Sequence, residues 1–148
     1  MLEIKPVKPN TTELADFLAL PKQIYQPDHL MQSEEEELAL IEGSHPLSSG
    51  LDTYAFIGYE ESQPCIRGLL TFYPDDEAAY LGFFESINDQ QTASAFIEHL
   101  AGFARSLGAS KIIGPVQASF WLGYRMQLTG TEELPFTCLL YTSDAADE

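Results

Sequence analysis

The chain has 148 residues, of which 23 are Asp or Glu and 7 are Lys or Arg, so its formal net charge is −16. Its apolar runs are far shorter than the roughly 20 residues of a membrane-spanning helix, and its few basic residues are scattered, which excludes a transmembrane protein and argues against a nucleic-acid-binding one. No signal peptide or disulfide framework is visible, so we expect a cytoplasmic protein with a single core.

The first elements predicted are a strand and a helix. Residues 2–7 form a short strand candidate that ends before Pro9. Asn10 and, three residues later, Glu13 have the capping-box pattern, which predicts that a helix starts there. Pro21 should kink or end this helix, because proline lacks an N–H group and clashes with the preceding turn.

A second helix is predicted from Ser33, with four consecutive glutamates, residues 34–37, in its first turn. Carboxylates at this position meet the positive end of the helix dipole. We interpret the run as a solvated helix start; the alternative is a site for a metal or a basic partner. Residues 43–50 are expected to form a loop.

Three strand candidates follow, at residues 53–59, 65–73 and 78–85. They contain aromatic and β-branched residues and are separated by short turns, which is typical of neighbouring strands. The pattern predicts an antiparallel meander.

Residues 93–107 have the clearest periodicity in the chain. Apolar residues recur at helical spacing, at Ala93, Phe96, Ile97, Leu100, Phe103, Ala104 and Leu107. Asn88 or Asp89 should cap the start of this helix, and Gly108 should end it. Because residues 111–116 read as a further strand, we expect a βαβ unit with its two strands parallel.

The order of these elements resembles that of the GNAT (acyl-CoA N-acyltransferase) fold. The segments LPKQIYQPDHL and LGFFESINDQQTASAFIEHLAGFARSLGASKIIGPV are similar to those of an uncharacterised bacterial GNAT-related family, and the resemblance covers most of residues 3–137. It implies an α/β (α+β mixed sheet) class: a truncated GNAT-like fold with an antiparallel meander, a βαβ crossover and its last strands missing.

The resemblance also implies a co-substrate, acetyl-CoA or another acyl-CoA, lying between splayed fourth and fifth strands. The residues that it assigns to acyl-CoA binding are Phe83, Phe84 and Glu85 for pantetheine, and Ser86, Ile87, Asn88, Asp89, Gln90 and Gln91 for the pyrophosphate. This loop departs from the family pattern because it has neither glycine nor a basic residue. In the alternative interpretation, Asn88 and Asp89 only cap their helix.

Glu85 stands where GNAT enzymes often hold a general base, so the resemblance assigns it that role; the alternative is a solvent-facing strand end. The general acid in such enzymes is commonly a tyrosine after the fifth strand. Tyr124 follows that strand, but its surroundings read as a loop. Together with Phe120 and Trp121 it would line a pocket or pack in the core.

Residues 138–148, CLLYTSDAADE, resemble the translation of a sequencing-library adapter, and a natural acidic tail is the alternative. We therefore expect an incomplete GNAT-like domain over residues 1–137, with a formal charge of −13, and an artefactual tail after it.

The function predicted is transfer of an acyl group from acyl-CoA to a small-molecule amine by the parent protein, with this chain an inactive fragment. The alternative is a GNAT-shaped module that binds or interacts without catalysis. The reactive side chains suggest no other chemistry: His29, His45 and His99 lack metal-ligand spacing, and Cys65 reads as a small buried hydrophobe.

Overall fold

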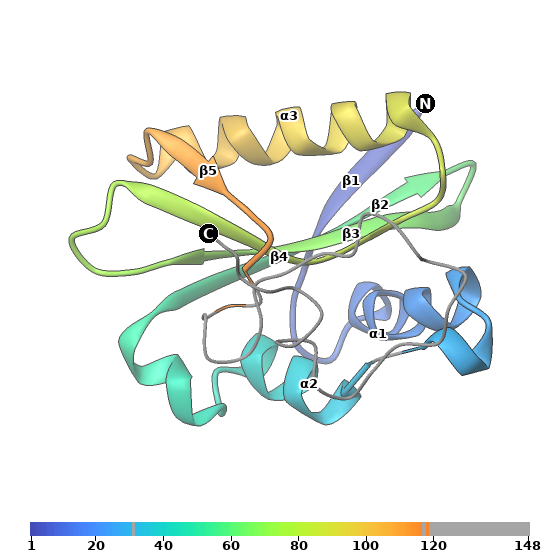
Figure 1. Ribbon diagram of the computed structural model, residues 1–148, viewed down its shortest axis with the longest axis horizontal. Helices are drawn as coiled ribbons and strands as arrows, with labels where there is room; N and C mark the ends of the chain where they lie inside the picture. Colours follow the sequence, from blue (N-terminus) through green and yellow to red (C-terminus); the bar gives the residue numbers. More distant parts are fainter. Residues whose placement is uncertain (31, 117, 119–148) are drawn as a thin grey trace, which may run out of the picture.

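The computed structural model describes residues 1–30, 32–116 and 118. Five strands form one sheet in the order β1-β2-β3-β4-β5, with antiparallel neighbours except for the parallel pair β4 and β5. Helix α3 covers one face of the sheet, and helices α1 and α2 cover the other (Figure 1). The elements are β1 (Leu2–Val7), α1 (Thr12–Ile24), the 3-10 helix η1 (Pro27–His29), α2 (Glu34–Glu42), the 3-10 helix η2 (Pro46–Gly50), β2 (Asp52–Glu60), β3 (Gln63–Phe72), β4 (Ala78–Ser86), α3 (Gln90–Ser106) and β5 (Lys111–Ile113).

This architecture confirms the predicted mixed sheet, its meander and its parallel βαβ unit. The expectation that the last strands are missing concerns residues outside the described ones and stays a prediction. Within the part of the chain that the structure describes, no helix has both the length and the apolarity that a bilayer crossing requires.

Helix α1 begins one residue later than the sequence predicts. The side chain of Thr11, not that of Asn10, accepts the capping hydrogen bond from the amide of Leu14, at 3.3 Å. Of the two effects predicted for Pro21, a kink or an end, the structure excludes the end, because the helix continues through the proline to Ile24. The last turn persists because the carbonyl of Pro21 still accepts a hydrogen bond from the amide of Tyr25, at 2.9 Å.

Helix α3 packs closely on the sheet because two strand positions opposite it are glycines. Phe96 and Leu100 of α3 are fully buried. A Cβ atom at Gly68 would lie 3.2 Å from the ring of Phe96, and one at Gly58 would lie 2.6 Å from the side chain of Ile66. The absence of side chains there lets the aromatic ring approach the strands.

The opposite face of the sheet holds the second core, between α1, α2 and the strands. Its buried apolar residues include Phe17, Leu40, Ile57, Leu69 and Phe83. On this face β3 and β4 also carry charged residues toward the helices, and these define the candidate site.

Candidate functional site

Glu85 lies near the C-terminal end of β4, and its Cα is paired with that of Arg67 on β3. The hydroxyl of Tyr25, the residue that directly follows α1, donates a hydrogen bond of 2.5 Å to Oε1 of Glu85. Burial raises the pKa of Glu85, while the hydrogen bond from Tyr25 and the charge of Arg67 act in the opposite direction. A carboxyl group with a raised pKa is suited to accept a proton near neutral pH.

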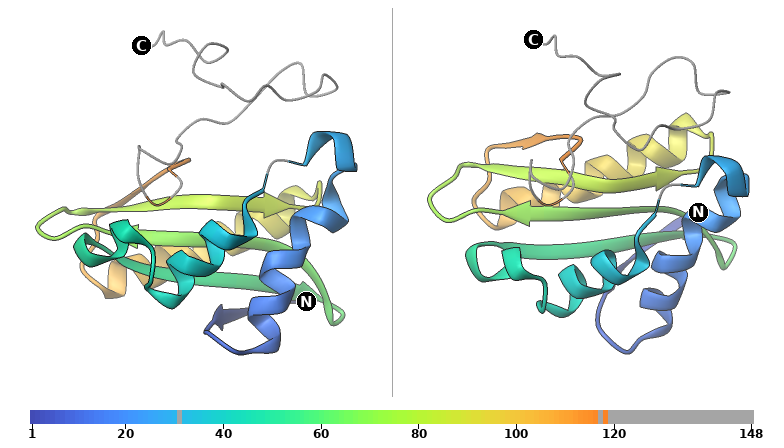
Figure 2. Two further views of the ribbon diagram at one scale, coloured as in Figure 1. Left: turned by 90° about the horizontal axis from the view of Figure 1, so that it is seen from below. Right: turned by 60° about the horizontal axis from the view of Figure 1, so that its bottom comes forward.

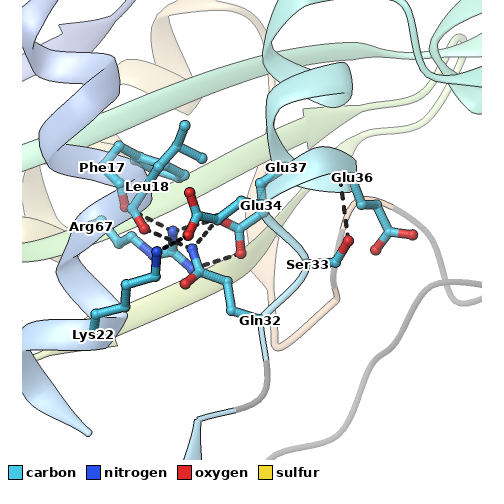
Figure 3. Close-up of polar contacts among 9 residues, drawn as sticks. All are labelled: Phe17, Leu18, Lys22, Gln32, Ser33, Glu34, Glu36, Glu37 and Arg67. Carbon is cyan, nitrogen blue, oxygen red and sulfur yellow. Dashed lines mark hydrogen bonds and ion pairs between the residues drawn. The ribbon is translucent and has the colours of Figure 1, made fainter. Parts of the chain in front are cut away.

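Arg67 is bound by a buried carboxylate on the neighbouring helix (Figure 3). Its Nη1 and Nη2 atoms lie 2.7 and 3.0 Å from Oε1 and Oε2 of Glu37 on α2, and the two side chains are 1% and 4% exposed. Nη1 also donates a 2.9 Å hydrogen bond to the carbonyl of Phe17, whose ring lies 4.5 Å from the guanidinium. Arg67 thus joins β3, α1 and α2 beside Glu85.

Glu37 corrects the interpretation of the glutamate run as wholly solvated. Glu35 is exposed, Glu34 and Glu36 are partly exposed, and Ser33 caps the helix as predicted, but Glu37 is buried and paired. The cause is helical spacing, since position 37 shares the inner face of α2 with the buried Leu40.

The connection between α1 and α2 is bound to the same network at its far end. The Nε2 atom of Gln32 donates to the carbonyl of Leu18, at 2.8 Å, and to Oε1 of Glu37, at 2.9 Å. Outside these buried contacts, Lys22 at the end of α1 and Glu34 at the start of α2 form an exposed ion pair (Figure 3).

Strand β5 pairs with only the first part of the longer strand β4 (Figure 2). Pairing joins Ala78, Ala79 and Tyr80 to β5, one further hydrogen bond links the amide of Val116 to the carbonyl of Leu81, and β4 continues to Ser86. A Cβ at Gly114 would lie 2.9 Å from the oxygen of Leu81, so glycine permits this last close contact. Within the described residues, β5 therefore pairs with the N-terminal part of β4 and not with the end that carries Glu85.

A β-bulge interrupts β4 beside this point. Arg67 pairs with Glu85 and Leu69 with Gly82, so that two residues of β4, Phe83 and Phe84, lie opposite the single residue between them on β3. Phe83 has a φ of 51°, which is sterically unfavourable for a bulky residue. The bulge turns the strand locally and places Glu85 on the face of α1.

The loop between β4 and α3 is organised by Asp89, the N-cap of α3. Its Oδ1 accepts from the amide of Gln91 and its Oδ2 from the hydroxyl of Thr92, both at 3.0 Å. The amides of Ile87 and Asp89 donate to the carbonyls of Cys65 and Ile87. The capping prediction is thus confirmed for Asp89, while the assignment of residues 86–91 to a pyrophosphate stays a prediction.

Several other predicted residues do not join the site. Tyr124, Phe120 and Trp121 lie outside the described residues. Cys65 is buried in β3 as predicted. Within the described ranges, no group of three His, Cys, Asp or Glu side chains is arranged to hold a metal ion.

A depression at the far edge of the sheet lacks comparable chemistry. Its volume is about 590 Å³, and it is lined by residues of β1 and β2 together with Ile41 and Phe103. Lys8 is the one charged residue in the lining. Glu85, Tyr25 and Arg67 therefore remain the group with the clearest reactive potential.

Sequence reasoning assigned a role to Glu85 but none to Tyr25, Arg67 or the individual residue Glu37. A charged residue within the apolar strand CIRGLL is a signal for a buried partner, because an unpaired charge is costly to bury. Tyr25 lies in the segment LPKQIYQPDHL but had no local signal for its contact, since its partner is 60 residues away.

Comparison with solved structures shows that the fold is that of GNAT proteins. A tandem GNAT protein from the clavulanic acid biosynthesis pathway matches with a TM-score of 0.62 and 12% identity, over 79% of this chain and 40% of that protein. The present chain thus spans less than half the length of that relative. No protein-family model and no curated protein sequence matches the chain.

Two further neighbours were solved with ligands. A predicted acetyltransferase from Clostridium acetobutylicum, solved with acetyl-CoA, matches with a TM-score of 0.53 and 13% identity over 97% of this chain and 100% of that chain. AAC(6')-Iy, in complex with the bisubstrate analogue CoA-S-monomethyl-acetylneamine, matches with a TM-score of 0.56 and 13% identity over 93% of this chain and 97% of that chain. These identities establish the fold and no more.

Proposed function

We propose that the parent protein of this chain transfers an acyl group from an acyl-CoA thioester to a small-molecule amine. The observation that carries the proposal is the position of Glu85: a partly buried carboxylate of raised pKa, held by Tyr25, at the end of β4 that the described part of β5 does not pair with. The GNAT fold supports the same chemistry, because neighbours with it were solved with acetyl-CoA and with a CoA-linked aminoglycoside analogue.

In this mechanism Glu85 is the general base. Glu85 first takes one proton from the ammonium group, and the lone pair that this frees on nitrogen forms a bond to the thioester carbonyl carbon. The carbon–sulfur bond then breaks with its electron pair on sulfur, and the nitrogen's second proton passes to that sulfur, so that CoA leaves as the thiol. Proton transfer by a positioned side chain contributes typically 10²–10⁴-fold in rate. The fixed backbone of β4 would orient the thioester, which lowers the entropic part of the barrier.

The acyl-CoA would lie along the end of β4 that β5 does not cover. The backbone at Phe83, Phe84 and Glu85 would contact the pantetheine arm, and residues 86–91 would lie next to the pyrophosphate. The N-terminus of α3 supports this placement, because a helix start attracts anions. The carboxylate of Asp89 opposes it, because it brings a negative charge to the same turn.

The acceptor is proposed to be a cationic amine. Residues 1–137 carry a formal charge of −13, and Glu85 lies near a second carboxylate, Glu37, whose charge Arg67 balances. A negative field raises the local concentration of cations and weakens at high ionic strength. Amine capture, measured as the KM for the amine, should therefore worsen as salt is added.

The experiment that tests the function uses the product of the uninterrupted gene. Isothermal titration with acetyl-CoA should give a binding heat, and release of free CoA thiol should accompany turnover with a panel of amines. The variant Glu85→Gln should retain acetyl-CoA binding and lose about 10²–10⁴-fold in kcat. Binding without any amine-dependent CoA release, or an unaffected Glu85→Gln variant, would contradict the mechanism.

The second candidate is a GNAT-shaped module that binds or interacts without catalysis. One observation favours it: the loop that would receive the pyrophosphate has no glycine or basic residue, and its Asp89 is already used as a helix cap. Absence of both a binding heat and a thermal shift with acetyl-CoA would support this candidate.

The assignment of residues 1–137 to an incomplete domain and of 138–148 to a translated adapter is also a proposal. Residues 119–148 lie outside the described ones. Sequencing the source gene beyond residue 137 tests it. If the tail is natural, the gene encodes CLLYTSDAADE after residue 137, and if the tail comes from an adapter, the gene encodes a different sequence there.

A further inference from the structure

The hydroxyl of Tyr25 is bonded to one oxygen of Glu85, which joins the α1–α2 connection to the end of β4. We propose that Tyr25 is a positioning residue for Glu85: it holds Oε1 in place and leaves Oε2 to take the proton of the amine. This inference rests on the proposed function for its reaction, but the contact itself can be tested without any substrate.

Tyr25 is well placed for this role because its backbone is fixed. Its amide donates a 2.9 Å hydrogen bond to the carbonyl of Pro21, in the last turn of α1. The other end of the connection is bound through Gln32 to Leu18 and Glu37. The phenol therefore reaches Glu85 from a segment that is bound at both of its ends.

Arg67 faces Glu85 from the neighbouring strand. Their Cα atoms are paired across β3 and β4, an arrangement that places the two side chains next to each other on one face. Arg67 is itself held by two bonds to Glu37 and one to Phe17. Among the described residues, the ionisable groups that act on Glu85 are Tyr25 from the end of α1, Arg67 from β3 and Glu37 from α2.

These groups act on Glu85 in opposite directions. Burial is the largest effect and raises its pKa, Glu37 raises it further, and the Tyr25 hydroxyl and the Arg67 charge lower it. Partial burial and the bond to Glu85 raise the pKa of Tyr25, so the phenol keeps its proton and remains a donor. Loss of that donor should make Glu85 more basic and leave its carboxylate free to rotate.

The first test is a pH titration of Glu85 by carbon-13 NMR in the 148-residue chain, with the signal assigned through Glu85→Gln. In Tyr25→Phe the midpoint should move upward by about one pH unit, the size expected when a hydrogen bond to a carboxylate is lost. The matched control is Tyr59→Phe, which removes a similar 2.6 Å phenol–carboxylate bond, to Asp16 on α1, and should leave the Glu85 midpoint unchanged.

The second test is the pH profile of kcat/KM in the uninterrupted gene product. Tyr25→Phe should move the acidic limb upward by the same amount as the NMR midpoint and lower kcat, whereas Tyr59→Phe should do neither. An unchanged midpoint in Tyr25→Phe would overturn the proposal whether or not the protein is an acyltransferase. If Tyr25→Phe moves the NMR midpoint of Glu85 but leaves the pH profile of kcat/KM unchanged, the proposed role of Tyr25 in the reaction is overturned.

The two proposals fail in different ways. If Glu85→Gln is fully active, the proposed role of Glu85 as general base is wrong. The NMR titration still decides whether Tyr25 lowers the pKa of Glu85. If Tyr25→Phe moves the midpoint and Glu85→Gln abolishes turnover, both proposals are supported.

Discussion

Arg67 donates a 2.9 Å hydrogen bond to the carbonyl of Phe17, the residue that stands four positions before Pro21 in α1. In an uninterrupted helix this carbonyl would accept the amide of residue 21, but proline has none. The guanidinium from β3 supplies the missing donor. The proline that the sequence marks as a helix breaker therefore creates the acceptor that helps to hold the buried arginine.

Breaking the Arg67–Glu37 pair should strongly destabilise the protein. Arg67→Met leaves the carboxylate of Glu37 buried without its main partner. This change should lower the free energy of unfolding by about 3–5 kcal/mol. The double variant Arg67→Met/Glu37→Met should recover a large part of the loss, because it removes both buried charges. Urea unfolding of wild type, Arg67→Met, Glu37→Met and the double variant measures both effects.

The control for this cycle is the pair of Lys22 and Glu34, whose side chains are 55% and 42% exposed. Lys22→Met should change the free energy of unfolding by no more than about 1 kcal/mol, because water screens the pair. Equal losses in Lys22→Met and Arg67→Met would show that burial does not govern the effect.

Two glycine-to-alanine changes should have opposite effects on stability. At Gly58 a Cβ would lie 2.6 Å from Ile66 and 3.0 Å from Leu2, so Gly58→Ala should cost about 1–3 kcal/mol by overpacking. Gly102 is exposed within α3 and has nothing within 4 Å of its Cβ position. Gly102→Ala should stabilise by about 0.5–1 kcal/mol, since alanine favours the helix. Thermal and urea unfolding test the difference in sign.

Substitutions at Asp89 separate its capping role from any effect of its charge. Asp89→Ala removes the acceptor for the amide of Gln91 and should cost about 0.5–2 kcal/mol of stability. Asp89→Asn retains a capping side chain and removes the charge. If residues 86–91 bind a pyrophosphate, the Kd for acetyl-CoA should fall about fivefold in Asp89→Asn, as expected for one partly screened charge. An unchanged Kd would place the pyrophosphate elsewhere.

The stability of the protein should depend on pH through Glu85. Because burial raises its pKa in the folded state above the ordinary value of 4.5, its contribution to folding is present below that pH and is lost as the pH rises through the folded pKa. Wild type should therefore lose stability relative to Glu85→Gln as the pH rises from 4.5 through the folded pKa. Urea unfolding at several pH values measures this difference.

Asp76 provides a contrast of opposite sign. The hydroxyl of Tyr80 and the amide of Ala78 donate to its carboxylate and lower its pKa. Its contribution to folding is present above the ordinary pKa and is lost as the pH falls through the folded one. The stability of wild type relative to Asp76→Asn should thus increase as the pH rises from 2 to 5. A relative stability that falls over this range would contradict the assignment of Asp76.

The elements of the fold could be predicted because their signals are local. The apolar spacing of residues 93–107 and the strand runs of the meander depend on neighbours a few positions apart, and so do the caps at Ser33 and Asp89. The same locality explains why the sequence predicts the cap of α1 one residue too early and allows either a kink or an end at Pro21. Asn10 and Thr11 are both good caps, and whether Pro21 ends a helix depends on what replaces its missing hydrogen bond.

The candidate site depends on contacts between distant segments. Glu85 could be singled out from its place at the end of a strand, but Tyr25 lies 60 residues away from it, and Glu37 lies 30 residues from Arg67. Nothing in the local pattern of α2 separates Glu37 from the three preceding glutamates, which are at least partly exposed, except the turn of the helix. Periodicity along the chain therefore specifies the helices and strands, whereas the packing of α1 and α2 on the sheet specifies which carboxylates are buried, because desolvation and pairing arise only when those surfaces meet.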